Sequence, residues 1–444
     1  MNMKLRKLTY LILSSVVFGL AIGSCNKYNA PTSVWNPNQK YASGAVITGV
    51  LPASTAIAGV REITIVGQNF SADPDSDWVW FGTQRANIKR LSVGSPADTI
   101  VIYRPPNFGS STLNVVIPAA DSSVTIPYAM EAPFTTADLS AIPTFLVMDA
   151  GKGDTLWIGG YVSVPGCSLY KLSSDGTSLS RVRDTSYFKP KIGGVKTDFA
   201  STFIDLKVGP GGFLYASFNS SASNKIYQLD MDTTVPKVFA GVTSQQKTVG
   251  YFDFDANGDI YTGNTKGLYC IKTDGTSQTA GDFSGLTFGE VRVIKDADGN
   301  TYLYAITGTG TPAHFTTLSR SLISSVGNLG NHEVLYDISK DTGFTTSNAL
   351  TSFNVGSDGS VVISVSGSSL TCSLYALDNG VLVSYYHDNI LPNGIDQLIW
   401  GNDKYLYLSR GKTASATAVR FYRMGMAKED GTPLNGAPYL GRGL

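Results

Sequence analysis

The chain has 444 residues, a length that suits two or three compact units, and 42% of them are apolar, which excludes disorder for most of the chain. Lys and Arg together number 34, as do Asp and Glu, and charged residues make up only 15% of the chain. This balance excludes a nucleic-acid-binding protein, which needs a basic surface to neutralise phosphates. The 47 glycines and the 11% of aromatic residues favour short strands joined by turns, so we expect an all-β fold.

The first 24 residues are predicted to be a signal peptide. Basic residues at positions 4, 6 and 7 precede the apolar stretch Leu8–Ala21, which is shorter than the ~20 residues that a membrane-spanning helix needs. The residues Ile22-Gly23-Ser24-Cys25 follow and resemble the lipobox of bacterial lipoproteins. That resemblance implies cleavage before Cys25 and acylation of this residue. The alternative is an ordinary signal peptide cleaved near an incidental cysteine.

A lipidated Cys25 predicts a protein held on a membrane by its acyl chains, at the outer membrane or cell surface and outside the cytoplasm. Downstream of it, the sequence has no second hydrophobic segment of spanning length. Residues 25–43 are rich in Asn, Pro, Ser and Tyr without periodicity and are predicted to form a flexible tether.

Residues 44–130 alternate apolar and polar residues in short runs separated by Gly, Pro and Asn, which predicts an antiparallel β-sandwich. The segments Val46–Pro52, Ile63–Phe70 and Trp80-Phe81-Gly82, followed by Tyr128, resemble an IPT/TIG immunoglobulin-like domain. Val60 stands where that family usually has the second glycine of a turn. The resemblance implies a spacer or recognition module without catalysis.

Two tryptophans of this domain, Trp78 and Trp80, are expected to project outward together. Successive side chains of a strand point to opposite faces, so Val79 and Phe81 share the other face, which the resemblance assigns to the core. The pair is a candidate platform for stacking a sugar ring or a partner surface. The alternative is that it packs against the second domain or the tether.

After a linker at residues 131–142, residues 143–444 are predicted to form a β-propeller of about six blades. A strand motif recurs six times at intervals of 43 to 59 residues, and a second strand motif follows each copy. Two copies, Asp255–Tyr261 and Asp296–Tyr302, resemble NHL-type blades. We take as equivalent the residues Trp157, Tyr215, Tyr261, Tyr304, Ile363 and Tyr407.

The combination of a lipobox, an IPT/TIG domain and such a propeller resembles cell-surface lipoproteins of gut-type Gram-negative bacteria, several of which are encoded with glycan-uptake systems. The repeats also place Cys167, Cys270 and Cys372 in the first, third and fifth blades. Blades that are not neighbours hold such positions beyond the ~7 Å limit for a disulfide. We therefore expect three buried free thiols.

No motif identifies an enzyme, a metal site or a cofactor. The segment Asp253–Ile260 fits the start of a calcium loop, but Asn264 stands at the twelfth position in place of Glu, and a hairpin turn is favoured. The chain has only three histidines and five glutamates, and no spacing singles out a pair of carboxylates for glycoside hydrolysis.

The predicted ligand site lies on one face of the propeller, where the loops before the inner strands and those between second and third strands open together. Aromatic residues in the first kind of loop suit sugar stacking, and the alternative for each is packing on its own blade. They are Tyr187, Phe188, Phe344, Tyr386 and His387.

The expected function is non-catalytic binding of a glycan through the propeller loops and the immunoglobulin-like domain. One alternative is a scaffold that binds protein partners in an outer-membrane complex, which a broad apolar patch would favour. The other is a propeller hydrolase or lyase, which a buried pair of carboxylates in the central funnel would favour.

Overall fold

The computed structural model describes residues 41–437 except 95, 119, 152, 154, 163–165, 189–190, 193–194, 197–201, 220–223, 243–248, 284, 311–312, 368–369, 387–389, 392, 402–404, 411–420 and 427–433. The predicted signal peptide, Cys25, most of the tether and His387 lie outside the described residues. No helix within the described ranges is long and apolar enough to cross a membrane.

The chain divides into two compact units. The described part of the smaller unit is residues 41–43 and 120–121, in which Ala42 forms a parallel bridge with Ala120. The larger unit starts at Gly44 and contains the two β-structures described next.

The first β-structure is the expected sandwich of two antiparallel sheets. One sheet has the order β1 (Val46–Leu51), β3 (Glu62–Gln68), β7 (Asp98–Tyr103), β6 (Ile88–Ser92). The other has the order β5 (Gln84–Arg85), β4 (Trp78–Phe81), β8 (Thr112–Val116), β9 (Val124–Pro127), and β2 (Thr55–Ile57) pairs in parallel with β10 (Ala129–Glu131). Alternate side chains of the facing strands are fully buried and form the core, including Ile63, Ile65, Val79, Leu113 and Val115.

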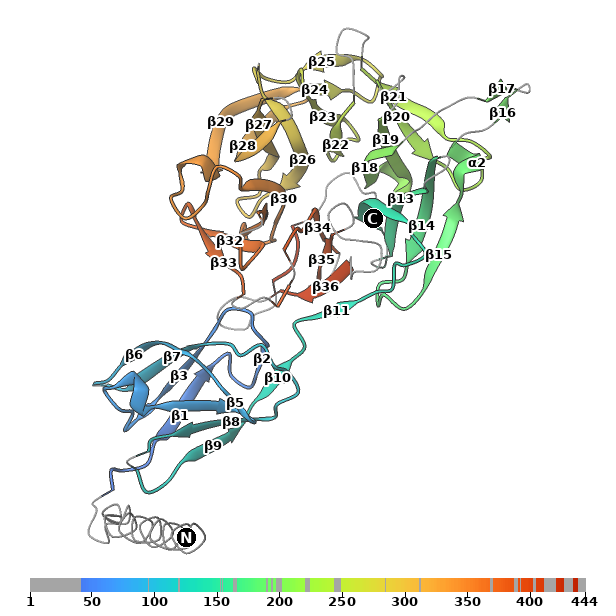
Figure 1. Cartoon of the computed structure of the whole chain (residues 1–444). Helices are drawn as coiled ribbons and strands as arrows, with labels where there is room; N and C mark the ends of the chain where they lie inside the picture. The colour runs from blue at the N-terminus through green and yellow to red at the C-terminus, as the bar shows by residue number, and fades with distance from the viewer. Residues whose placement is uncertain are drawn as a thin grey trace, which may run out of the picture. The chain divides into compact units, whose positions relative to one another are not determined.

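The second β-structure is a propeller, with six four-stranded sheets in the described part of the chain arranged round a common centre (Figure 1). From the centre outward, the first blade is β12 (Thr144–Ala150), β13 (Leu156–Val162), β14 (Gly166–Leu172), β15 (Leu179–Arg183), and the second is β18 (Thr202–Val208), β19 (Leu214–Asn219), β20 (Lys225–Leu229), β21 (Lys237–Gly241). The third is β22 (Tyr251–Phe254), β23 (Ile260–Asn264), β24 (Gly267–Ile271), β25 (Ser277–Thr279).

The fourth blade is β26 (Thr287–Lys295), β27 (Thr301–Thr309), β28 (His314–Ser325), β29 (Asn328–Asp337), and the fifth is β30 (Ala349–Val355), β31 (Val361–Ser366), β32 (Leu374–Asp378), β33 (Val381–Ser384). The sixth contains β34 (Gln397–Trp400), β35 (Tyr405–Ser409) and β36 (Phe421–Gly425).

The outer strand of the sixth blade comes from the other end of the propeller sequence. It is β11 (Phe134–Thr136), which pairs antiparallel with β36 through Phe134 and Met424. The stretch predicted to be a linker thus contains a strand of the ring. Its pairing covers the backbone groups that β36 would otherwise present as an open edge.

The repeat motif is confirmed in four blades, displaced by two residues in the fourth and by one residue in the fifth. Thr301 pairs with Lys295 just as Leu214 pairs with Val208, so Tyr302 and not Tyr304 occupies the position of Tyr215. Val361 pairs with Val355 just as Leu214 pairs with Val208, so Val362 and not Ile363 occupies the position of Tyr215. The error in the fifth blade arose because three β-branched residues in succession carry no aromatic marker. The Asp255–Asp259 segment is the favoured hairpin turn, closed by a bond from the Asp255 N–H to the Asp259 carbonyl (2.9 Å).

Four inner strands carry a β-bulge near their start. The pairing register shifts just before Val147 in β12, Asp205 in β18, Glu290 in β26 and Ser352 in β30. A bulge changes the direction of the side chain that follows it. It thereby sets which side chains of these strands point at the central channel and at the next blade.

The three cysteines of the propeller are buried and form no disulfide, as expected. Cys167 lies in β14, Cys270 in β24 and Cys372 two residues before β32. Burial raises the pKa of the Cys270 thiol to about 12 and also raises the pKa of Cys372.

Candidate functional site

A side chain from the inner strand of each blade accepts a hydrogen bond from a backbone N–H of the inner strand in the next blade. Four of these six acceptors are carboxylates, and the other two are a hydroxyl and an amide oxygen. The six bonds are Asp149 to Val208 (2.7 Å), Asp205 to Phe252 (3.1 Å), Asp253 to Val293 (2.9 Å), Glu290 to Phe353 (3.1 Å), Ser352 to Leu398 (3.0 Å) and Gln397 to Met148 (2.9 Å).

These inter-blade hydrogen bonds explain why acidic residues lie in an otherwise apolar inner strand. Buried backbone N–H groups need an acceptor, and a carboxylate bonds to them more strongly than a neutral group does. Asp149, Asp205 and Asp253 are each more than nine-tenths buried. The carboxylates therefore hold neighbouring blades together.

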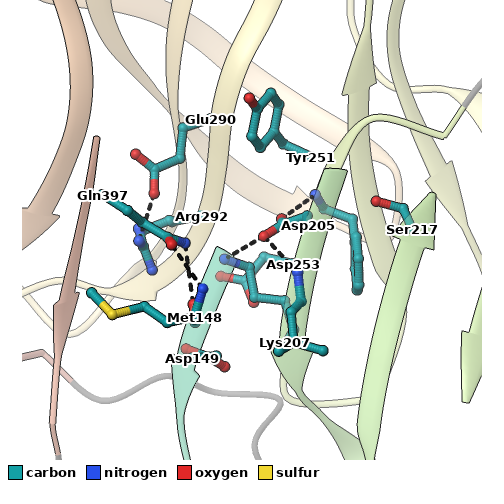
Figure 2. Close-up of polar contacts among 12 residues, drawn as sticks. Met148, Asp149, Asp205, Lys207, Ser217, Tyr251, Asp253, Glu290, Arg292 and Gln397 are labelled. Atoms are coloured by element: carbon teal, nitrogen blue, oxygen red, sulfur yellow. Dashed lines mark hydrogen bonds and ion pairs between the residues drawn. The ribbon is translucent and has the colours of Figure 1, made fainter. Parts of the chain in front are cut away.

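Two buried cations lie beside these acids (Figure 2). The Lys207 ammonium is 3.4 Å from the Asp205 carboxylate, and the Arg292 guanidinium is 2.5 Å from the Glu290 carboxylate. Arg292 also donates to the carbonyl of Leu398 in the sixth blade at 2.8 Å. Both basic residues lie two positions after their acidic partner, so each pair follows the same face of one strand.

Burial dominates the electrostatics of this layer. It raises the pKa of Asp205 to about 6, against the opposing effects of Lys207 and of two backbone N–H bonds, and the Glu290 charge adds to the rise. Burial likewise raises the pKa of Asp253. Burial alone would lower the pKa of Lys207, but the Asp205 carboxylate and its acidic neighbours make the net direction upward.

A cavity of about 260 Å³ opens at the mouth of the channel above this layer. Its walls come from the starts of inner strands, together with Phe315 at the start of β28 and Ser366 at the end of β31. This is the face on which the sequence places the ligand. The side chains that give the cavity its chemistry are Asp205, Tyr251, Glu290, Phe315, Asp396 and Gln397.

One glycine shapes the cavity wall. A Cβ on Gly289 would lie 2.9 Å from two carbon atoms of the Phe315 ring, so only glycine lets that ring pack where it does. In the described part of the chain, no three His, Cys, Asp or Glu side chains are grouped so that they could hold a metal ion.

Two aromatic residues predicted to contact a ligand lie in the core instead. Tyr187 and Phe188 are in the short helix α2 (Thr185–Phe188), and both are buried. The Phe188 ring packs edge-on against Phe203 (5.4 Å), and the Tyr187 hydroxyl donates to the carbonyl of Asp230 (3.1 Å). The structure contradicts an open aromatic face here, because burial of these rings stabilises the first and second blades.

The other two described aromatic candidates also pack on their own blade. Tyr386 is only 1% exposed, and its hydroxyl accepts from the Ser373 N–H at 3.1 Å. Phe344 is half-buried against Tyr375, with ring centres 5.4 Å apart. The alternative that each loop aromatic packs on its own blade is thus the one that the structure supports.

Trp78 and Trp80 lie on the face of β4 opposite Val79 and Phe81, as expected, and are half-buried. The Trp78 indole N–H donates to the carbonyl of Asp75 (3.1 Å), and the Arg85 guanidinium lies 5.2 Å from the centre of the Trp78 ring. These contacts fix the Trp78 ring within its own domain.

No sequence motif singled out Tyr251, Phe315 or Gln397 as site residues. The sequence does contain a pattern that could have identified Tyr251 and Gln397. Asp205, Tyr251, Ser352 and Gln397 stand at equivalent positions of four inner strands. Each lies two residues before the residue that pairs with the motif position of the second strand. Polar residues repeated at one position of apolar strands mark a shared channel. Phe315 carried no such signal, because it lies in a third strand.

The fold of the first domain agrees with its family match. Residues 45–131 match the IPT/TIG domain. This IPT/TIG domain is the sandwich formed by β1 to β10, and the propeller follows it. A search of curated proteins finds no match to the chain.

Several solved structures resemble the chain at low identity. A protein of unknown function from Bacteroides thetaiotaomicron is 13% identical, with 88% of this chain and 99% of that chain covered and a TM-score of 0.45. An auxiliary nutrient binding protein from Bacteroides ovatus is 11% identical over the same shares, with a TM-score of 0.46. A gluconolactonase from Xanthomonas campestris is 11% identical over 64% of this chain and 86% of that chain, with a TM-score of 0.45.

Proposed function

We propose that this protein is a lipid-anchored, non-catalytic binding protein of the cell surface that takes a sugar ring into the mouth of its propeller channel. The observation that carries the proposal is the composition of the cavity. Two aromatic rings and several polar groups line it together, and two of its carboxylates, Asp205 and Glu290, are already engaged in inter-blade hydrogen bonds.

The side chains of the cavity suit the two kinds of surface that a sugar presents. The rings of Tyr251 and Phe315 offer apolar faces to the C–H groups of a pyranose. Gln397 has a second amide N–H and Ser352 a hydroxyl proton beyond their inter-blade hydrogen bonds, and both can donate to its hydroxyls. At about 260 Å³ the cavity is smaller than the ~300 Å³ at which pockets for drug-sized ligands begin. It therefore favours one sugar unit over a longer segment of chain.

The engagement of the two carboxylates argues against catalysis. Asp205 accepts from the N–H groups of Leu206 and Phe252, and Glu290 accepts from Phe353 and from Arg292. A glycosidase needs one carboxyl group free to give up a proton and one free to attack or to activate water. Here both carboxylates accept hydrogen bonds that hold neighbouring blades of the propeller together.

Calorimetry of the full chain with a panel of monosaccharides tests the binding function. We expect binding by the wild type and at least a tenfold loss in Tyr251→Ala. Phe213→Ala is a matched control, because Phe213 is 44% exposed and lies outside the cavity lining. If no monosaccharide binds the wild type, or if Tyr251→Ala binds as the wild type does, the proposed function is wrong.

The membrane anchor rests on the lipobox residues ending in Cys25. Metabolic labelling with a fatty acid should mark the wild type and leave Cys25→Ala unlabelled. Equal labelling of both would refute the anchor without touching the binding function.

One observation supports a second candidate function, the cleavage of glycosides by a hydrolase or lyase reaction. Asp205 and Glu290 line the same cavity, and the pKa of Asp205 is raised to about 6, in the range of a general acid. Release of nitrophenol from aryl glycosides by the wild type, abolished in Asp205→Asn, would establish it. Absence of turnover with a sugar that binds would leave the binding function as the better account.

A further inference from the structure

The wall of the cavity has an uneven distribution of charge. Three carboxylate residues line it, Asp205, Glu290 and Asp396, and the lining formed by described residues includes no Lys or Arg. The nearest cations, Lys207 and Arg292, are two residues further along their strands, outside the lining. The charged side chains in the wall of the cavity are therefore all acidic.

The buried groups next to the cavity do not balance this charge. The wall and the layer beneath it together hold the five acidic residues Asp149, Asp205, Asp253, Glu290 and Asp396 and the two basic residues Lys207 and Arg292. The Glu290 charge raises the free energy of the ionised Asp205 carboxylate, since two like charges share one partly dehydrated site. A cation placed between them would relieve that repulsion.

The carboxylates also have unused hydrogen-bonding capacity. A carboxylate offers about four lone-pair positions. Glu290 uses two of them, for Phe353 and Arg292, and Asp205 uses three, for Leu206, Phe252 and Lys207. Each can accept one further N–H donor from a ligand without losing an inter-blade hydrogen bond.

The aromatic side chains add a second attraction for the same kind of ligand. The rings of Tyr251 and Phe315 lie in the same wall as the acids. The face of an aromatic ring attracts an ammonium group, by about 0.5–2 kcal/mol depending on how dry the site is. The cavity thus combines anionic acceptors and π-faces, which together recognise a protonated amine.

We propose that the cavity selects a sugar that carries a protonated amine, that is, an unacetylated amino sugar. This rests on the proposed function, because it names the class of sugar taken by the same cavity. The ring of such a sugar packs on Tyr251 or Phe315, and its ammonium group donates to Asp205, Glu290 or Asp396. An N-acetylated sugar lacks the charge and is bulkier at that position.

Calorimetry of the full chain at neutral pH with glucosamine, glucose, N-acetylglucosamine and methylamine tests this selectivity. We expect glucosamine to bind at least tenfold more tightly than the two neutral sugars and than methylamine. Equal affinity for glucosamine and glucose overturns the selectivity and leaves the proposed function standing. Binding of methylamine as tightly as glucosamine overturns it too, since the site would then recognise a cation alone. If none of the sugars binds, the proposed function itself fails.

Removing one wall charge provides a second test. Asp396 is half-buried at the rim of the cavity, so Asp396→Asn changes the charge at nearly constant shape. We expect the ratio of glucosamine to glucose affinity to fall at least threefold. Asp378→Asn is the matched control, because Asp378 is exposed at the end of β32 and lies outside the lining. An unchanged ratio in Asp396→Asn, with thermal unfolding like that of the wild type, overturns the proposal.

Discussion

Gln397 and Met148 join the last blade of the propeller to the first by two hydrogen bonds. The Gln397 side-chain oxygen accepts from the Met148 N–H at 2.9 Å, and its side-chain nitrogen donates to the Met148 carbonyl at 3.1 Å. The residues are 249 positions apart in the sequence. The other five inter-blade hydrogen bonds join blades that are consecutive in the chain, so this pair completes the circle at the channel while β11 completes it at the outer edge.

Replacement of Gln397 should therefore destabilise the whole propeller. In Gln397→Ala, the Met148 N–H and carbonyl lose their partners, and each buried unsatisfied group costs about 1–3 kcal/mol. We expect the free energy of unfolding to fall by roughly 2–4 kcal/mol in denaturant titrations. Gln397→Glu should lie between Ala and the wild type, because Glu can accept but cannot donate. Gln228→Ala, a half-buried change in β20, should have little effect, and a similar loss in both variants would contradict the role of Gln397.

The contributions of Glu290 and Arg292 to the free energy of unfolding should be strongly coupled. Glu290→Ala leaves the fully buried Arg292 without its carboxylate, which typically costs about 3–5 kcal/mol. The double variant Glu290→Leu/Arg292→Met removes both charges and should be less destabilised than Glu290→Ala. Denaturant unfolding of Glu290→Leu, Arg292→Met and the double variant measures the coupling. Additive losses would show that the two side chains act independently.

Asp205 should make stability depend on pH between about 4 and 6. Its pKa is about 6 in the folded protein and 3.8 ordinarily, so the folded state holds the proton more tightly. In that window, the free energy of unfolding decreases as pH rises, by up to about 3 kcal/mol at ~1.4 kcal/mol per pKa unit. Asp205→Asn should lose this contribution and keep the one of the same sign that comes from the raised pKa of Asp253.

Asp274→Asn serves as the control of opposite sign for that experiment. Hydrogen bonds from the Thr276 hydroxyl and N–H lower the pKa of Asp274, so this carboxylate contributes stability above its ordinary pKa that is lost as pH falls. Thermal unfolding from about pH 2 to pH 7 compares the three proteins, because the window of Asp274 lies below its ordinary pKa of 3.8 and that of Asp205 lies above it. The account of Asp205 is wrong if its Asn variant keeps the slope of the wild type.

The three propeller cysteines should be unreactive until the protein unfolds. The thiolate is the reactive form, and burial raises the pKa of Cys270 to about 12 and raises that of Cys372 as well. In a Cys25→Ser variant, a thiol reagent should detect almost no thiol in the native protein and three in denaturant. Detection of one thiol in denaturant would reveal a disulfide.

Phe188 should act as a core residue. It is fully buried, and truncation of a buried phenylalanine typically costs about 3–5 kcal/mol, so Phe188→Ala should lower the free energy of unfolding by that amount. Phe108→Ala is the control, because Phe108 is 61% exposed and its loss should change stability by no more than about 0.5 kcal/mol. Loss of sugar binding by Phe188→Ala at unchanged stability would instead restore the ligand role that the sequence suggested.

The sequence predicted the features that repeat. The alternation along β4 placed Val79 and Phe81 in the sandwich core, and the period of the strand motif placed Cys167, Cys270 and Cys372 in separate blades. Both predictions succeed because the strand period of two and the recurring turns are local properties. Two residues were misplaced. Tyr304 was chosen where Tyr302, two residues earlier on the same face of the strand, holds the position, and Ile363 lies where three β-branched residues made adjacent positions indistinguishable.

Sequence by itself determined the all-β class and the order of a sandwich and a propeller. Only the tertiary structure decided that Tyr187, Phe188 and Tyr386 are core residues, that β11 belongs to the sixth blade, and that Gln397 meets Met148. Whether a loop aromatic points outward or into its blade depends on the free volume left by residues far away in the chain. The pattern that predicts a strand depends on residues that are neighbours in the sequence. The channel is instead formed by six segments that come together only when the propeller closes.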